Sequence, residues 1–273
     1  MSEYSLIIFE RLKLSSGNGE EMKTKEKREI TFKTTDKLEI AANLYQGTKP
    51  SKNLLILAPG FAQFKDSNIL TEMSESFSSL GDLVCLDFRG TGKSQGCYDF
   101  GAQEYRDLEP ILKWGRKHYK KVVLIGLSLG GYHSIRAAKE WPEAVDQVMI
   151  VSSPTSVEDV VKTGGPLFQF TFFLTDWKSL RRRINLGFDL FFNWGNPFSC
   201  KPDVSNVVKE MKAPLDVLVG SRDWLVQNHL TEKIYRNAQN KKSWTCFKHG
   251  HHSELMYLQD EARFKNWIES KIN

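Results

Sequence analysis

The chain has 273 residues, a length that fits one large domain or two small ones and allows a sizeable hydrophobic core. Hydrophobic residues make up 40% of the sequence and charged residues 26%, a balance that excludes wholesale disorder, collagen-like repeats and a coiled coil. The net charge of +5 comes from scattered lysines and arginines, with positions 181–183 as the densest run, and this weak asymmetry does not indicate a nucleic-acid partner.

We expect neither a signal peptide nor a membrane span in the N-terminal region. Its apolar run at positions 6–9 is short, charged residues flank it, and the basic-then-apolar layout of a signal peptide is absent. No window of the chain approaches the roughly 18 consecutive apolar residues of a transmembrane helix. We therefore expect a cytoplasmic protein, with residues 1–27 as an N-terminal extension that a polar turn at 15–19 interrupts.

Alternating apolar and polar residues predict two antiparallel strands at 30–34 and 38–45. Beyond Pro50 the pattern changes to short apolar runs, which are typical of parallel strands buried on both faces. These runs are residues 54–58, 83–87, 122–126, 148–151 and 215–220, and 244–247 is the next predicted strand. Apolar residues at three- and four-residue spacing predict helices at 67–80, 103–119, 131–141, 230–238 and 261–272. This alternation predicts an α/β fold with a mostly parallel central sheet and helices on both faces.

The alternation breaks between residues 154 and 203. This segment has no clear buried strand, is too long for an ordinary connection, and holds ten of the 32 aromatic residues of the chain, which has 17 Phe, 8 Tyr and 7 Trp. We predict a helical lid at 154–203. The core of the fold then consists of residues 28–153 and 204–273.

The sharpest motif is Gly126-Leu127-Ser128-Leu129-Gly130, a G-x-S-x-G pattern. A predicted strand precedes it and a predicted helix follows it, so Ser128 lies where a strand turns abruptly into a helix. Such a turn strains the serine backbone, and the flanking glycines let the strand and the helix approach each other. The hydroxyl then lies beside a helix N-terminus, which favours developing negative charge. The motif predicts a nucleophilic serine, and the alternative is an incidental serine in a glycine-rich turn.

A serine nucleophile needs a positioned base and an orienting carboxylate, and both follow it in the order Ser, Asp, His. Asp223 comes just after the strand at 215–220, at the carboxyl end where sheets of this kind place their sites. The candidate bases, His249, His251 and His252, lie just after the strand at 244–247. The other histidines, His118, His133 and His229, fall in or beside predicted helices, where we expect surface or packing roles.

Metal and nucleotide sites are less favoured interpretations. No acidic cluster accompanies the histidines at 249–252, and the adjacent His251 and His252 point in different directions. Residues 87–94 end like a phosphate loop, but Asp87 stands where the G-x-x-x-x-G-K spacing requires glycine. The four cysteines are far apart, without CxxC pairing, and we assign them neither a disulfide nor a metal: Cys85, Cys97, Cys200 and Cys246. We expect no metal and no cofactor.

The sequence contains, in this order, LLILAPGF at 54–61, DFRGTGKS at 87–94, GLSLGG at 126–131, GSRD at 220–223 and GHHSE at 250–254. Together these segments resemble serine hydrolases of the α/β-hydrolase superfamily, over about residues 28–272. They are specific for the fold and much less so for the substrate, because the superfamily spans esterases, lipases, thioesterases, peptidases and acyl transferases. The resemblance implies that Ser128 is the nucleophile, Asp223 the orienting acid, and the backbone amides of Phe61 and Leu129 the oxyanion hole.

Two positions need comment. Family members commonly have His-Gly where this chain has Pro59-Gly60, but the oxyanion donor is the N–H after the glycine, so Pro59 leaves it intact. His252 precedes Ser253 and Glu254, which resembles the His-small-Glu ending of some bacterial members. His251 follows a glycine, as in the commoner Gly-His form. We favour His252 as the base, with His251 as the alternative. If Asp223 is not the acid, Asp203 or Asp216 is the substitute.

The resemblance also places the segment at 154–203 above the nucleophile. Phe172 and Phe191 would then offer an apolar surface to substrate, although such rings can equally pack the lid onto the body. We predict a hydrolase that cleaves the carboxylic ester or thioester of a small-molecule substrate with a small to medium apolar acyl group, through an acyl-serine. The residues leave open an acyl transferase or peptidase on the same fold, and a non-catalytic ligand-binding homologue.

Overall fold

A computed structural model describes residues 26–46, 50–61, 63–99, 101–159 and 201–272. Its centre is an eight-stranded sheet in the order β1-β2-β4-β3-β5-β6-β7-β8. The strands are β1 (Glu26–Lys33), β2 (Glu39–Gln46), β3 (Asn53–Ala58), β4 (Asp82–Leu86), β5 (Lys121–Leu127), β6 (Gln147–Val151), β7 (Leu215–Gly220) and β8 (Lys241–Phe247). β2 runs antiparallel to β1 and β4, whereas all pairs from β4 to β8 are parallel. Each predicted strand is present, and the predicted antiparallel start is confirmed.

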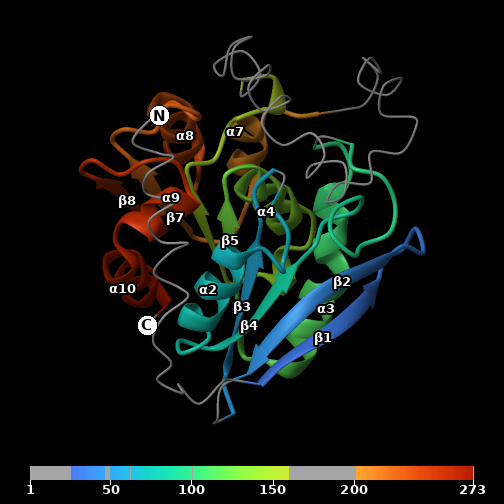
Figure 1. The fold of residues 1–273 in the computed structure, drawn as a ribbon. Coiled ribbons are helices and arrows are strands. Elements are labelled where there is room, and N and C mark those ends of the chain that lie inside the picture. The colour runs from blue at the N-terminus through green and yellow to red at the C-terminus, as the bar shows by residue number, and fades with distance from the viewer. Residues whose placement is uncertain (1–25, 47–49, 62, 100, 160–200, 273) are drawn as a thin grey trace, which may run out of the picture.

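Helices cover both faces of the sheet (Figure 1). Along β3, Leu54 and Ile56 face one core, and Leu55 and Leu57 face the other. The first core packs against α3 (Leu108–His118), α4 (Leu129–Glu140), α7 (Val204–Val207) and α8 (Asn228–Asn237). The second packs against α2 (Asn68–Phe77), α9 (Glu254–Gln259) and α10 (Glu261–Ile272). The predicted fold class is therefore confirmed, because alternate residues of buried strands supply both cores.

Some boundaries differ from the predictions. β1 begins four residues before position 30. The side chains of residues 27–29 are exposed at the edge of the sheet, and no apolar alternation marks a strand there. α7 and α9 are absent from the predicted elements, because helices of four and six residues are too short to show a helical period. Residues 1–25 and 160–200 lie outside the described part of the chain, and with them most of the predicted lid, including Phe172 and Phe191. Within the described residues, no helix has the length and apolarity to cross a bilayer.

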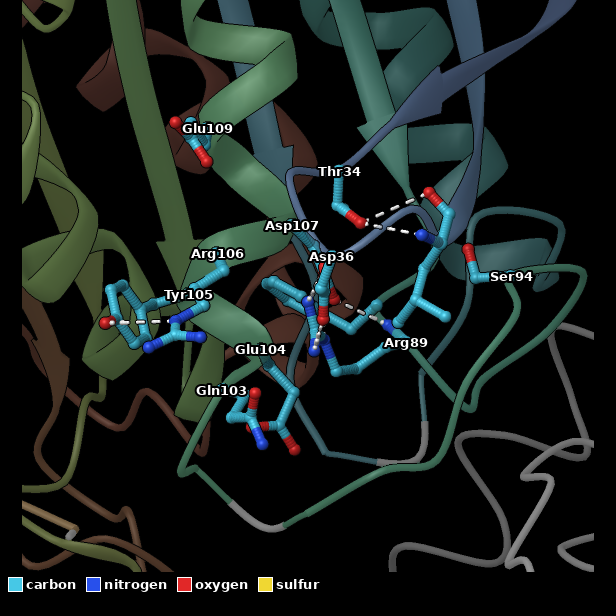
Figure 2. A network of polar contacts seen from close by, with 12 residues as sticks. Thr34, Asp36, Arg89, Ser94, Gln103, Glu104, Tyr105, Arg106, Asp107 and Glu109 are labelled. Carbon is cyan, nitrogen blue, oxygen red and sulfur yellow. Dashed lines mark hydrogen bonds and ion pairs between the residues drawn. The ribbon is translucent and has the colours of Figure 1, made fainter.

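A buried ion pair ties the loop after β4 to the start of α3 (Figure 2). The Arg89 side chain is 4% exposed, and its Nε and Nη2 donate to Oδ1 of Asp107 over 2.8 and 2.6 Å. The Arg89 backbone N–H donates to the other carboxylate oxygen over 2.7 Å. Asp36 in the β1–β2 turn accepts from Nη1 over 2.8 Å, but its side chain is 37% exposed. The same loop carries Tyr98, whose ring centroid lies 5.6 Å from that of Phe61. The Arg89–Asp107 ion pair therefore helps to hold this loop beside the predicted oxyanion hole.

α4 carries a buried histidine whose pKa is lowered by its surroundings. His133 is buried between Phe88 and Tyr132, with ring centroids 4.8 and 5.4 Å away, and neither ring nitrogen has a hydrogen-bond partner among the described residues. Burial, reinforced by the charges of Arg136 and Arg89, lowers the pKa of His133 well below its ordinary value of 6.5. Because the unfolded chain takes up this proton more readily, His133 makes folding less favourable as the pH falls below 6.5.

We expect His133→Phe to flatten the acid side of the stability curve. Phenylalanine fills the same aromatic site and takes up no proton. Between pH 7.5 and 5.0, the free energy of unfolding of the native protein should fall by up to about 2 kcal/mol more than that of the variant. Urea denaturation at a series of pH values measures this difference. Parallel curves for the two proteins would show that His133 is protonated inside the fold.

Candidate active site

Ser128 occupies the turn between β5 and α4 in a strained conformation. Its φ is 50° and its ψ is −119°, a combination that non-glycine residues rarely adopt. Two hydrogen bonds hold it there: the Ser128 N–H donates to the Val151 carbonyl over 2.8 Å, and the Gly131 N–H donates to the Ser128 carbonyl over 2.9 Å. The strain predicted from the G-x-S-x-G pattern is therefore present in the backbone.

The flanking glycines allow a close approach of main chains. A Cβ at Gly126 would lie 2.4 Å from the Cα of Gly131, and a Cβ at Gly130 would lie 2.1 Å from the carbonyl oxygen of Ala58. Either contact is shorter than atoms tolerate, so only glycine fits at these two positions. The start of α4 is thereby packed directly on the ends of β3 and β5, with Ser128 between them.

Asp223 and His252 form a hydrogen-bonded pair. Asp223 follows β7 and its side chain is fully buried; its Oδ1 accepts from the backbone N–H groups of Leu225 and Val226 over 3.0 and 2.9 Å. Its Oδ2 lies 2.8 Å from Nδ1 of His252. Because an ionised carboxylate only accepts hydrogen bonds, Nδ1 carries the proton, and Nε2 of the neutral ring has a free lone pair.

The alternative residues have other partners. The backbone N–H of His251 donates to Oε1 of Gln259 over 2.9 Å. Asp203 caps α7 through the N–H of Ser205 and pairs with Nζ of Lys233, each over 2.8 Å. Asp216 lies within β7, where its Oδ2 accepts from Gln147 over 2.7 Å. Of the carboxylates that the sequence offers, the structure brings Asp223 to the histidine cluster.

Hydrogen bonds connect the loop of His252 with the turn of Ser128. Val151, which accepts the Ser128 N–H, is followed by Ser152, and the Ser152 side chain accepts the N–H of Ser253 over 3.4 Å. β5 to β8 are parallel neighbours, so their carboxyl ends lie at one edge of the sheet. This edge therefore carries Ser128, Asp223 and His252.

The segments that carry the predicted oxyanion donors, Phe61 and Leu129, both run close to the serine. A Cβ at Gly60 would be 3.2 Å from Cβ of Ser128 and 3.3 Å from the carbonyl oxygen of Leu127, so the main chain leading to Phe61 passes close to the serine. Leu129 is the first residue of α4, and the N–H groups of a first helical turn have no acceptor within the helix. The main chain therefore passes close to Ser128 at Gly60 and continues from it at Leu129.

The remaining candidates stand apart from this site. His133 is in the core, and His118 and His229 are exposed on α3 and α8. Cys85 is buried, Cys97 and Cys246 are exposed, and all three are free thiols. In the described part of the chain, no three or more His, Cys, Asp or Glu side chains are grouped as they would be around a metal ion.

Sequence reasoning missed two features of the site. Ser152 and Ser253 have positive φ angles of 50° and 41°, and no local pattern identifies a serine in that conformation. Glu254 ends the GHHSE segment at 250–254, and the sequence predicts no role for it. Its Oε1 would lie 3.3 Å from a Cβ at Gly60, beside the serine. Its position two residues after the favoured histidine was the available signal.

Comparisons with known proteins support the resemblance. The family model of the S15 X-Pro dipeptidyl-peptidases matches residues 82–183, a range that contains Ser128 but ends before Asp223 and His252. No curated protein is significantly similar in sequence. Esterase Pf2001 from Pyrococcus furiosus is similar in structure, with a TM-score of 0.71 and 21% identity over 93% of this chain and 95% of that chain.

Two further structures extend this result. An esterase from a Rhodococcus species has a TM-score of 0.65 and 16% identity over 90% of this chain and 99% of its own. An alpha/beta hydrolase fold protein from Chitinophaga pinensis has a TM-score of 0.62 and 15% identity over 92% of this chain and 98% of its own. The chain therefore has the α/β-hydrolase fold that the resemblance implied, and the names of these neighbours agree with the prediction of a hydrolase.

Proposed function

We propose that this protein is a serine hydrolase that cleaves carboxylic esters through an acyl intermediate on Ser128. The observation that carries the proposal is the 2.8 Å contact between Asp223 and His252, at the sheet edge where Ser128 is strained. A buried carboxylate that fixes one imidazole nitrogen leaves the other to act as the base for a serine. The structural similarity to esterases supports the ester as the substrate class.

The chemistry follows from these positions. Nε2 of His252 takes the proton as the Ser128 oxygen attacks the carbonyl carbon, and Asp223 stabilises the imidazolium that forms. The N–H groups of Phe61 and Leu129 stabilise the negative charge on the carbonyl oxygen. His252 then protonates the leaving alcohol, and a water molecule activated by the same nitrogen releases the acid and restores the serine.

Turnover of p-nitrophenyl butyrate by the native protein and by Ser128→Ala tests this proposal. We expect a loss of at least about 10³-fold in kcat, because the nucleophile has no substitute. A fluorophosphonate should label the native protein at Ser128, as peptide mapping would show. Ser79→Ala, which removes an exposed hydroxyl after α2, should retain both turnover and labelling. Equal turnover by Ser128→Ala and the native protein would refute the serine mechanism.

A peptidase is the second candidate, because the family model that matches residues 82–183 describes X-Pro dipeptidyl-peptidases. The same three residues would cleave an amide through the same acyl-enzyme. Comparing a dipeptidyl p-nitroanilide that ends in proline with a p-nitrophenyl ester separates the two. We expect a higher kcat/KM for the ester, and the reverse order would favour the peptidase.

The proposal includes a lid at 154–203 that offers apolar surface to the acyl chain. Each buried methylene is worth about 0.8 kcal/mol, so two more carbons should raise kcat/KM by roughly tenfold until the pocket ends. We therefore expect activity on p-nitrophenyl esters to rise from acetyl to a medium-length chain. Phe172→Ala and Phe191→Ala should flatten this trend. A profile that falls steadily from acetate, with folded protein, would assign these rings to packing.

A further inference from the structure

The carboxylate of Glu254 lies beside the proposed nucleophile. Glu254 is the first residue of α9. Gly60 has no side chain, but a Cβ built on it would lie 3.3 Å from Oε1 of Glu254 and 3.2 Å from Cβ of Ser128. The carboxylate and the serine therefore approach the same side of the Gly60 main chain. No step of the proposed mechanism uses Glu254.

This carboxylate is largely buried without a protein partner. Glu254 is 8% exposed, none of the hydrogen bonds or ion pairs among the described residues reaches its side-chain oxygens, and these oxygens are not among the fully buried polar atoms. By contrast, the neighbouring buried carboxylate of Asp223 accepts two backbone N–H groups and contacts His252. This carboxylate keeps a narrow contact with water and has no protein donor, so a ligand that donates to it can take the place of that water.

A strained backbone directs Glu254 to this place. Ser253, between His252 and Glu254, has a φ of 41° and a ψ of −110°. The Ser253 N–H is held by Oγ of Ser152, and the N–H of Leu255 donates to the His252 carbonyl over 2.8 Å. Strain of this kind in a non-glycine residue persists only where the surroundings enforce it, and it concentrates at functional sites. Here it orients the residues on both sides of Ser253.

We propose that Glu254 determines specificity at the proposed esterase site by binding a protonated amine that the substrate carries close to its scissile carbonyl. An ammonium group supplies the donors that the carboxylate lacks and forms a charge-assisted hydrogen bond. It also neutralises a negative charge that would otherwise oppose the oxyanion developing beside Ser128. A role limited to the N-terminus of α9 would need no particular substrate, so the two roles are separable by experiment. This inference rests on the proposed hydrolase function.

The test compares two p-nitrophenyl esters of nearly equal shape. The N,N-dimethylglycine ester carries a protonated amine at pH 6.5, and the 3-methylbutanoate ester is its neutral counterpart. The ratio of their kcat/KM values is measured for the native protein, for Glu254→Gln and for Glu269→Gln, an exposed residue near the end of α10. Intrinsic reactivity cancels, because all three proteins receive the same two esters. A second pair, 2-(dimethylamino)ethyl butyrate and 3-methylbutyl butyrate, moves the protonated amine to the alcohol side.

We expect Glu254→Gln to lower the cationic-to-neutral ratio by at least about tenfold for one of the two pairs, as the loss of a charge-assisted hydrogen bond implies. Glu269→Gln should keep the native ratio. Should Glu254→Gln fail to fold, Glu254→Asp replaces it, and its shorter carboxylate should lower the ratio by a smaller factor.

Two failures are distinguishable. An unchanged ratio for both pairs, with Ser128-dependent turnover of the neutral esters, overturns the role of Glu254 and leaves the hydrolase intact. If the native protein neither cleaves these esters nor reacts with a fluorophosphonate at Ser128, the proposed function fails, and the inference fails with it.

Discussion

Replacing Asp223 with asparagine should lower kcat by about four orders of magnitude while the protein remains folded. The amide oxygen can still accept the N–H groups of Leu225 and Val226, which now donate over 3.0 and 2.9 Å, so the loop after β7 keeps its shape. The amide nitrogen, however, would face Nδ1 of His252 as a donor. The ring proton then moves to Nε2, and the nitrogen that should deprotonate Ser128 is no longer a base.

Steady-state kinetics on p-nitrophenyl butyrate, with circular dichroism to verify folding, measures this effect. Asp203→Asn is the matched control: Asp203 caps α7 and pairs with Lys233, away from the histidine. Its kcat should stay within a few-fold of the native value. A near-native rate for Asp223→Asn, together with a large loss for Asp203→Asn, would transfer the acid role to Asp203.

The same assay decides between the adjacent histidines. His252→Ala should reduce kcat as strongly as the loss of a general base implies, because Nδ1 of His252 is the atom that contacts Asp223. His251→Ala should retain most activity. Loss of turnover in His251→Ala alone would make His251 the base and require the Asp223–His252 contact to be structural.

The sequence predicts the sheet well because its central strands are buried on both faces. Residues such as 54–58 and 122–126 form unbroken apolar runs, and the structure buries them between two helical layers. The strained turn at Ser128 is also foreseeable, because glycines at 126 and 130 are the residues that such a close approach requires. Both patterns involve residues that are close together in the chain, so a single sequence is enough to detect them.

Long-range contacts explain what the sequence does not reveal. Which of His251 and His252 faces Asp223 depends on the direction of the backbone at that residue. The strained conformation of Ser253 depends on a contact with Ser152, a residue 101 positions earlier. No period or motif encodes such a contact. The orientation of Glu254 towards Gly60 has the same origin, because it requires the loops after β3 and β8 to meet. The short helix α9 follows from this meeting rather than from its own six residues.

Replacing Asp107 with leucine should lower the free energy of unfolding by about 3–5 kcal/mol, because it leaves the Arg89 guanidinium buried without its main partner. The backbone N–H of Arg89 also loses its acceptor. For a chain of this size such a loss lowers Tm by roughly 10 °C.

Asp36→Asn tests the outer half of the same network. Its carboxylate contacts the same guanidinium but is 37% exposed, and an exposed partner contributes about 0–1 kcal/mol. Calorimetry should therefore separate Asp107→Leu from Asp36→Asn clearly.

The double variant Arg89→Met/Asp107→Leu should be more stable than Asp107→Leu alone, because it leaves no unpaired charge buried at this place. If Asp107→Leu and Asp36→Asn shift Tm equally little, water reaches Arg89 and the pair contributes no more than a surface contact. In that case the loop that carries Tyr98 would be held by its other contacts, such as the hydrogen bonds of Ser94 with Ala41 and Asp87.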